Sequence, residues 1–166
     1  VGGYRYFRYR EGLSIHEHLN VTQPGGGVAV GTTFDILDVF STENDFHGGE
    51  LGLSTVFDHG SWSLDVLTKV ALGNMHQNVN IDGVNVVTPP NQAPLPGHGG
   101  FLALSTNMGG YNRNEFAVLP ELDMNLRYCV SERLSLALGY SLLWITNVQR
   151  SGDQIDVGVN VSQLPA

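Results

Sequence analysis

Apolar and polar residues alternate along much of the chain, and a period of two is typical of β-strands rather than helices. In residues 116–128 every second residue is apolar or aromatic, while Glu121, Asp123, Asn125 and Arg127 lie between them. Residues 134–144 repeat the pattern, with Leu, Tyr or Trp alternating mainly with small residues. Helical periodicity is almost absent, so the sequence predicts an all-β fold.

The same pattern, interrupted by turn residues, predicts five strands. They lie near residues 1–19, 46–58, 61–75, 114–130 and 133–148. The alternation in residues 1–19 is too irregular to fix which of its side chains share a face. Asp58–Ser61 and Ser131–Arg133 are typical of tight hairpin turns. Long loops are expected over 20–45, 76–113 and 149–166, where Gly, Pro and polar residues accumulate.

Short turns and long loops therefore alternate, which predicts an antiparallel up-and-down meander with all its short turns at one end. Outer-membrane β-barrels have this asymmetry, so we interpret the chain as a single domain that forms part of a transmembrane β-barrel. The apolar face is then expected to contact lipid at Leu51, Leu53, Phe57, Trp62, Leu64, Val66, Val70, Leu72, Leu122, Met124, Leu126, Leu136, Leu138, Tyr140 and Leu142. The pore-lining candidates on the other face are Glu50, Asp65, Lys69, Glu121, Asp123, Asn125 and Arg127.

A second interpretation stays open. A soluble lipocalin-like β-barrel would turn the same apolar faces inward, around a small apolar ligand. Small residues such as Gly52, Ala71 and Gly139 on the polar face favour a pore wall over a solvated exterior. Aromatic residues toward the strand ends, among them Trp62 and Trp144, also favour a membrane protein.

Composition narrows the function classes further. The chain has 166 residues and a formal net charge of −8, with 16 Asp and Glu against 8 Lys and Arg. Such an acidic chain is a poor binder of nucleic acid, because phosphates attract clustered Lys and Arg. The single cysteine, Cys129, excludes an intrachain disulfide framework.

No motif predicts an enzyme, a cofactor or a metal site. Residues 26–33 approach a phosphate-binding loop, but Thr32 stands where its lysine is needed. His16 and His18 share a strand face, yet no third metal ligand is evident. Glu121 and Asp123, roughly 7 Å apart by strand rise, resemble a glycosidase pair. Beside Lys69, Asp65 and Arg127, they are better interpreted as a cross-strand charge network.

Several segments resemble a bacterial outer-membrane β-barrel family of putative porins, of the planctomycete type. They are Gly3–Tyr6, Asn44–Gly52, Lys69–Asn74, Phe116–Glu121, Gly152–Asp156 and Asn160–Pro165. The resemblance covers nearly the whole chain. It implies a transmembrane barrel, the bacterial outer membrane as location, and transport as a presumed role, with no catalytic or substrate-binding residues to carry over.

The resemblance also predicts that this is a C-terminal portion of a longer protein. Five strands cannot close a membrane barrel, for which about eight are needed. The expected partners are membrane lipid and the remaining strands of the full-length barrel. We expect an open sheet with a broad exposed apolar face and an irregular segment over 149–166. A closed barrel with the apolar side chains packed inside would contradict the membrane interpretation.

Overall fold

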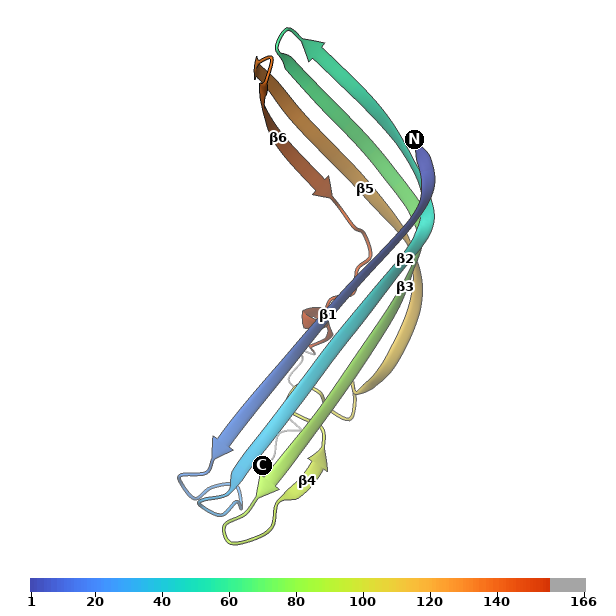
Figure 1. Ribbon diagram of the computed structural model, residues 1–166. Helices are drawn as coiled ribbons and strands as arrows, with labels where there is room; N and C mark the ends of the chain where they lie inside the picture. Colours follow the sequence, from blue (N-terminus) through green and yellow to red (C-terminus); the bar gives the residue numbers. More distant parts are fainter. Residues whose placement is uncertain (156–166) are drawn as a thin grey trace. The chain divides into compact units, whose positions relative to one another are not determined.

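The structure, a computed structural model, describes residues 1–155 (Figure 1). Its elements are β1 (Gly2–Asn20), β2 (Thr33–His59), β3 (Trp62–Thr88), β4 (Leu95–His98), β5 (Gly109–Ser131), β6 (Leu134–Leu143) and a short 3-10 helix, η1 (Ser151–Gln154). They form one sheet in the order β1-β2-β3-β5-β6, with β4 paired to β3. The all-β antiparallel meander predicted from the sequence is confirmed.

Both hairpin turns lie where the sequence places them. β2 ends at His59 and β3 begins at Trp62, with Gly60 between them at a φ of 61°. Glycine adopts this left-handed conformation without the steric cost that a Cβ would add. The second turn joins Ser131 of β5 to Leu134 of β6.

The long loops are shorter than the sequence predicts. Residues 33–45 and 76–88 were expected in loops, but they belong to β2 and β3. In β2 the period of two continues, with Ile36, Asp38, Phe40, Thr42 and Asn44 all buried. Because polar and apolar residues are mixed on the buried face, the segment lacks the hydrophobic alternation that marks a strand in a sequence.

Two compact units make up the chain. Unit 1 contains Val1–Arg8, Asn44–Gln77 and Asn114–Val148, and its core is Phe46, Ala71, Met75, Ala117 and Leu119. Unit 2 contains Tyr9–Glu43, Asn78–Arg113 and the segment from Gln149, and its core is Phe40, Val79, Ile81 and Ala103. In each unit the core is small, and it lies on one face of the sheet.

The register of β5 and β6 in unit 1 separates two kinds of face. Leu122 pairs with Leu142, Met124 with Tyr140, Leu126 with Leu138 and Tyr128 with Leu136. Between these pairs, Asp123 is opposite Ser141, Asn125 is opposite Gly139 and Arg127 is opposite Ala137. Since successive residues of a strand point to opposite sides, unit 1 has one apolar face and one polar face.

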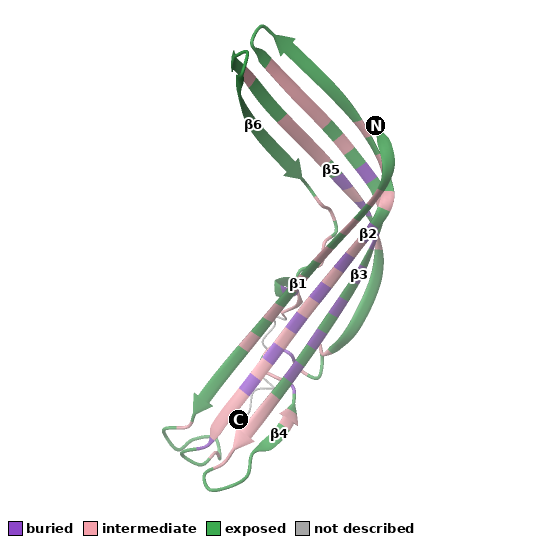
Figure 2. Cartoon of the chain, in the orientation of Figure 1, coloured by how far each residue is buried: buried purple, intermediate pink, exposed green. Residues whose placement is uncertain are grey.

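The apolar face of unit 1 is open to the surroundings. The side chains of Leu51, Leu53 and Leu138 are 71%, 75% and 73% exposed. Every residue of β6 is exposed (Figure 2). Four residues of the predicted lipid-facing set are half-buried, namely Leu64, Val66, Leu122 and Met124. They lie on β3 and β5, inner strands of the sheet, where neighbours on both sides cover them.

A buried carboxylate organises the connection after β4 in unit 2. Asp38 is 1% exposed and accepts hydrogen bonds from the backbone N–H groups of Phe101, Leu102 and Ala103 at 3.2, 3.2 and 2.8 Å. A Cβ built on Gly100 would meet the Asp38 Oδ1 at 1.8 Å, so only glycine lets the backbone approach so closely. The loop is thereby fixed to β2.

The segment after β6 differs from the irregular loop expected over 149–166. In unit 2, Arg150 and Ser151 bond to Glu11, and Ser151 is fully buried. Residues 156–166 of that prediction lie outside the described part of the chain. Among residues 1–155, no helix is long and apolar enough to cross a membrane.

Candidate functional site

The polar face of unit 1 carries a charge network that joins four strands. Arg5 of β1 donates to Glu50 of β2 at 2.8 Å and to Glu121 of β5 at 2.5 Å. Lys69 of β3 donates to the other oxygen of Glu121 at 3.0 Å. The four side chains are only 14–22% exposed. Three of them, Glu50, Lys69 and Glu121, were predicted to share this face.

Asp123 extends the network to a fifth strand. Its carboxylate accepts a hydrogen bond from the Ser141 hydroxyl of β6 at 2.5 Å. Asn125 lies beside Gly139, where an added Cβ would come within 2.7 Å of the amide oxygen. The small residues of β6 therefore make room for the polar side chains of β5.

The remaining predicted candidates lie away from this cluster. Arg127 is exposed, opposite Ala137 and near the short turn. Asp65 is half-buried on β3, four residues from Lys69 and thus on the same face.

Sequence reasoning missed Arg5, which bridges the two glutamates. The register of residues 1–19 was left open, because Tyr and Arg alternate there and neither set is plainly apolar. The structure fixes it through backbone hydrogen bonds in both directions between Val1 and Gly52. The sequence did hold a signal for a further cation. Glu50 and Glu121 were predicted to share this face, and Lys69 alone cannot balance the charge of both.

The network pairs both of its glutamates with cationic side chains. Both oxygens of Glu121 accept from cationic partners, and such ion pairs satisfy charges that are partly shielded from water. Arg5 and Lys69 balance Glu50 and Glu121, so Asp123 leaves the five-residue group with one net negative charge. No group of three His, Cys, Asp or Glu residues that could hold a metal occurs within residues 1–155. His18 pairs with Asp35 at 2.6 Å.

Aromatic residues lie at both ends of the apolar face, measured along the strands. Near the short turns, the rings of Trp62 and Tyr128 pack with centroids 4.4 Å apart. At the other border the Tyr4 hydroxyl and the His47 ring nitrogen Nδ1 form a hydrogen bond, and Leu51 lies four residues after His47 on the same face of β2. The apolar run between the borders on β3 spans residues 62–72, which is about 25 Å for a strand tilted by roughly 40°.

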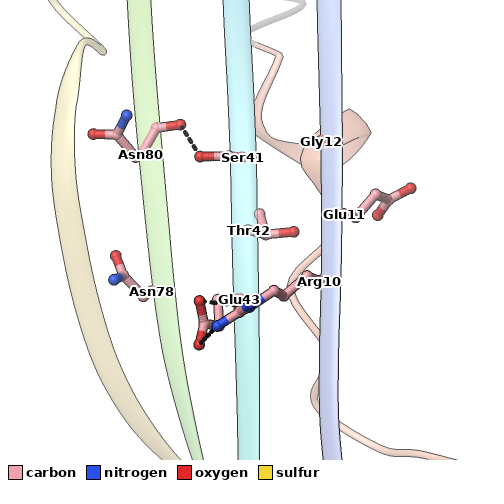
Figure 3. Close-up of a pocket in the computed structure, with 8 residues that line it drawn as sticks. All are labelled: Arg10, Glu11, Gly12, Ser41, Thr42, Glu43, Asn78 and Asn80. Atoms are coloured by element: carbon pink, nitrogen blue, oxygen red, sulfur yellow. Dashed lines mark hydrogen bonds and ion pairs between the residues drawn. The ribbon is translucent and has the colours of Figure 1, made fainter.

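Unit 2 has a polar hollow of about 320 Å³ over β1, β2 and β3 (Figure 3). Arg10 pairs there with Glu43 at 2.9 Å. The next residue of β1, Glu11, instead accepts from Arg150 at 3.2 Å and from the Ser151 backbone N–H at 3.2 Å. The hydrogen bond from Arg150 lowers the pKa of Glu11 from its ordinary value of 4.5.

This contact predicts a pH-dependent segment. A carboxyl whose pKa is lowered in the folded state stabilises that state above its ordinary pKa, and the contribution disappears as the pH falls below it. We therefore expect the Ser151 amide to lose protection from hydrogen exchange as the pH falls below about 4.5. In Glu11→Gln, whose side chain does not titrate, the protection should be insensitive to pH over this range. Equal pH profiles in the two proteins would contradict the prediction.

Comparison with known proteins gives one family. A family model described as "Putative beta barrel porin-7 (BBP7)" matches residues 1–166. No curated protein and no solved structure matches the chain.

Proposed function

Since the chain belongs to the Putative beta barrel porin-7 family, we propose that it forms part of the wall of a water-filled pore in a bacterial outer membrane. The polar face of unit 1 lines the pore, and the apolar face contacts lipid. The role is non-enzymatic. The partners are membrane lipid and the strands that pair with the outer edges of β1 and β6.

One observation carries this proposal. In unit 1 the apolar side chains are exposed on one face, while a half-buried charge network covers the other. A soluble protein rarely exposes a continuous apolar surface of this breadth. In a membrane the arrangement is favourable, since lipid contacts the apolar face and water in the pore solvates the polar face.

The lipocalin-like alternative has less support. It requires the apolar residues to pack inside around a ligand, yet Leu51, Leu53 and Leu138 are among the most exposed large apolar residues of unit 1. The charged residues would then face bulk solvent, where each exposed ion pair contributes only about 0–1 kcal/mol. Extraction of the protein as a monomer without detergent would favour this alternative.

A surface scaffold is a second candidate within the same family. The connection over residues 99–108 is held by Asp38 and by Asn107, whose amide donates to the Leu102 carbonyl at 2.9 Å. An ordered long loop is suited to display at the cell surface. A scaffold of this kind needs no open passage, so conductance distinguishes it from a pore.

The pore predicts a measurable ion preference. In Asp123→Asn the hydrogen bond from Ser141 can persist, while one negative charge is lost from the polar face. A unit charge at about 7 Å in water contributes roughly 0.6 kcal/mol, or about threefold in local cation concentration. We therefore expect the cation-to-anion permeability ratio of the full-length protein in planar bilayers to fall by at least about threefold.

Glu132→Gln is the matched control, since it removes one negative charge at the short turn between β5 and β6. It should change the permeability ratio much less. Equal shifts in the two variants would contradict the assignment of the pore-lining face. Absence of conductance in every form of the protein would overturn the pore.

A further inference from the structure

The chain leaves the sheet at Asn147, four residues after the end of β6. Trp144 and Thr146 still donate to the Pro120 and Val118 carbonyls of β5, at 3.0 and 3.3 Å. Asn147 then adopts a φ of 55°, and its side-chain amide donates to the Phe116 carbonyl at 2.7 Å. The Asn147 side chain thus takes the hydrogen bond that a further strand residue would have made, and the strand ends there.

In unit 1 the residues around this turn pack on the polar-face side of the sheet. Ile145 and Val148 contact the core that contains Phe46, Met75 and Leu119. Phe46 lies four residues from Glu50 on β2, and Leu119 lies two residues from Glu121 on β5, so both belong to the face of the charge network. Gln77, buried on β3, donates to the Asn147 carbonyl.

In unit 2 the following residues are fixed to β1 and β2. The Ser151 hydroxyl donates to the Glu11 carbonyl at 2.9 Å and lies 3.4 Å from the Thr42 hydroxyl. Ile155 packs against the core that contains Phe40, Val79 and Ile81. The segment is therefore a built part of the sheet's inner surface and not a free loop.

We propose that residues 145–155, which we call the strap, cross the inner wall of the pore, narrow it and limit the size of the solutes that pass. The inference rests on the proposed pore function. Within each unit the strap covers the side of the sheet that would otherwise face the aqueous passage. Its solutes are accordingly small and hydrophilic.

Glu11 is the contact of the strap that is best suited to a test by substitution. Its carboxylate accepts hydrogen bonds from both the Arg150 guanidinium and the Ser151 backbone N–H. Glu11→Ala removes both contacts at a position that lies outside the charge network of unit 1. Glu132→Ala, at the short turn, is the matched control.

Conductance of the full-length protein in planar bilayers tests the strap. Glu11→Ala should raise the single-channel conductance at least about twofold, or open a channel that is closed in the unchanged protein. Glu132→Ala should leave the conductance unchanged. A conducting protein whose conductance is the same with and without Glu11→Ala would overturn the strap and leave the pore intact. Absence of current in all forms would overturn the proposed function and the strap with it.

A disulfide that holds the strap to β2 provides a second test, which does not depend on removing a contact from the fold. Thr42→Cys and Ser151→Cys, in a Cys129→Ser background, replace two hydroxyls that lie 3.4 Å apart. Oxidised, this protein should keep the low conductance even when Glu11→Ala is added. Reduction should then release the strap and raise the conductance. If oxidation has no effect on the conductance of the Glu11→Ala form, the strap does not narrow the pore.

Discussion

Leu138→Arg is expected to destabilise the membrane-inserted protein by about 2–4 kcal/mol, the cost of a cationic side chain at the bilayer midplane of a β-barrel. Leu138 lies near the middle of β6 on the apolar face and pairs with Leu126. An arginine there has no partner in the hydrocarbon region. Urea unfolding of the full-length protein in lipid vesicles measures the loss, and a smaller heat-modifiable band on gels should accompany it.

Asn125→Arg is the control for this prediction. Asn125 precedes Leu126 on β5, so it lies at nearly the same depth but on the polar face, opposite Gly139. The same cation should be tolerated there, because water in the pore solvates it. Equal destabilisation by the two substitutions would contradict the assignment of the faces.

Asp38→Ala is expected to detach residues 101–103 from β2 and to destabilise unit 2 by about 3 kcal/mol or more. The buried carboxylate accepts from three backbone N–H groups, and each buried group left without a partner costs about 1–3 kcal/mol. Hydrogen exchange at the amides of Phe101, Leu102 and Ala103 measures the local effect. Exchange there should become faster while the amides of β6, in unit 1, keep their rates.

Asp38→Asn gives the graded comparison. The amide oxygen can keep the bonds from Leu102 and Ala103, while the new NH₂ group faces the Phe101 N–H that Oδ2 now accepts. Hydrogen exchange at residues 101–103 of Asp38→Asn should therefore be faster than in the unchanged protein and slower than in Asp38→Ala. If both substitutions leave the exchange rates unchanged, the carboxylate does not hold the loop.

The strands of unit 1 could be predicted from sequence because their two faces differ so strongly in polarity. Leu, Tyr and Trp recur at every second position of residues 134–144, and the register of β5 with β6 pairs these residues with the apolar set of β5. A shift by one residue would exchange the two faces, so this pattern specifies the register tightly. The membership of Glu50, Lys69 and Glu121 in one cluster followed from the same alternation.

The parts of β2 and β3 that lie in unit 2 could not be predicted in this way. Asp38 and Thr42 occupy buried positions of β2, where their hydrogen bonds depend on residues far away in the chain. Arg5 escaped prediction because the polar and aromatic residues of β1 give no clear face. The strap escaped it as well, since the turn at Asn147 depends on bonds to Phe116 and Gln77 rather than on a turn motif.

The central claim is that the apolar face of unit 1 contacts lipid while the polar face contacts water. Spin labels on single cysteines at residues 136–140 of β6, in a Cys129→Ser background of the full-length protein in lipid vesicles, test it most directly. The account predicts an alternation with period two. Labels at Leu136, Leu138 and Tyr140 should be accessible to oxygen, which concentrates in lipid, and labels at Ala137 and Gly139 to a water-soluble nickel chelate. Uniform access of the chelate to all five positions, or the reverse alternation, would contradict it.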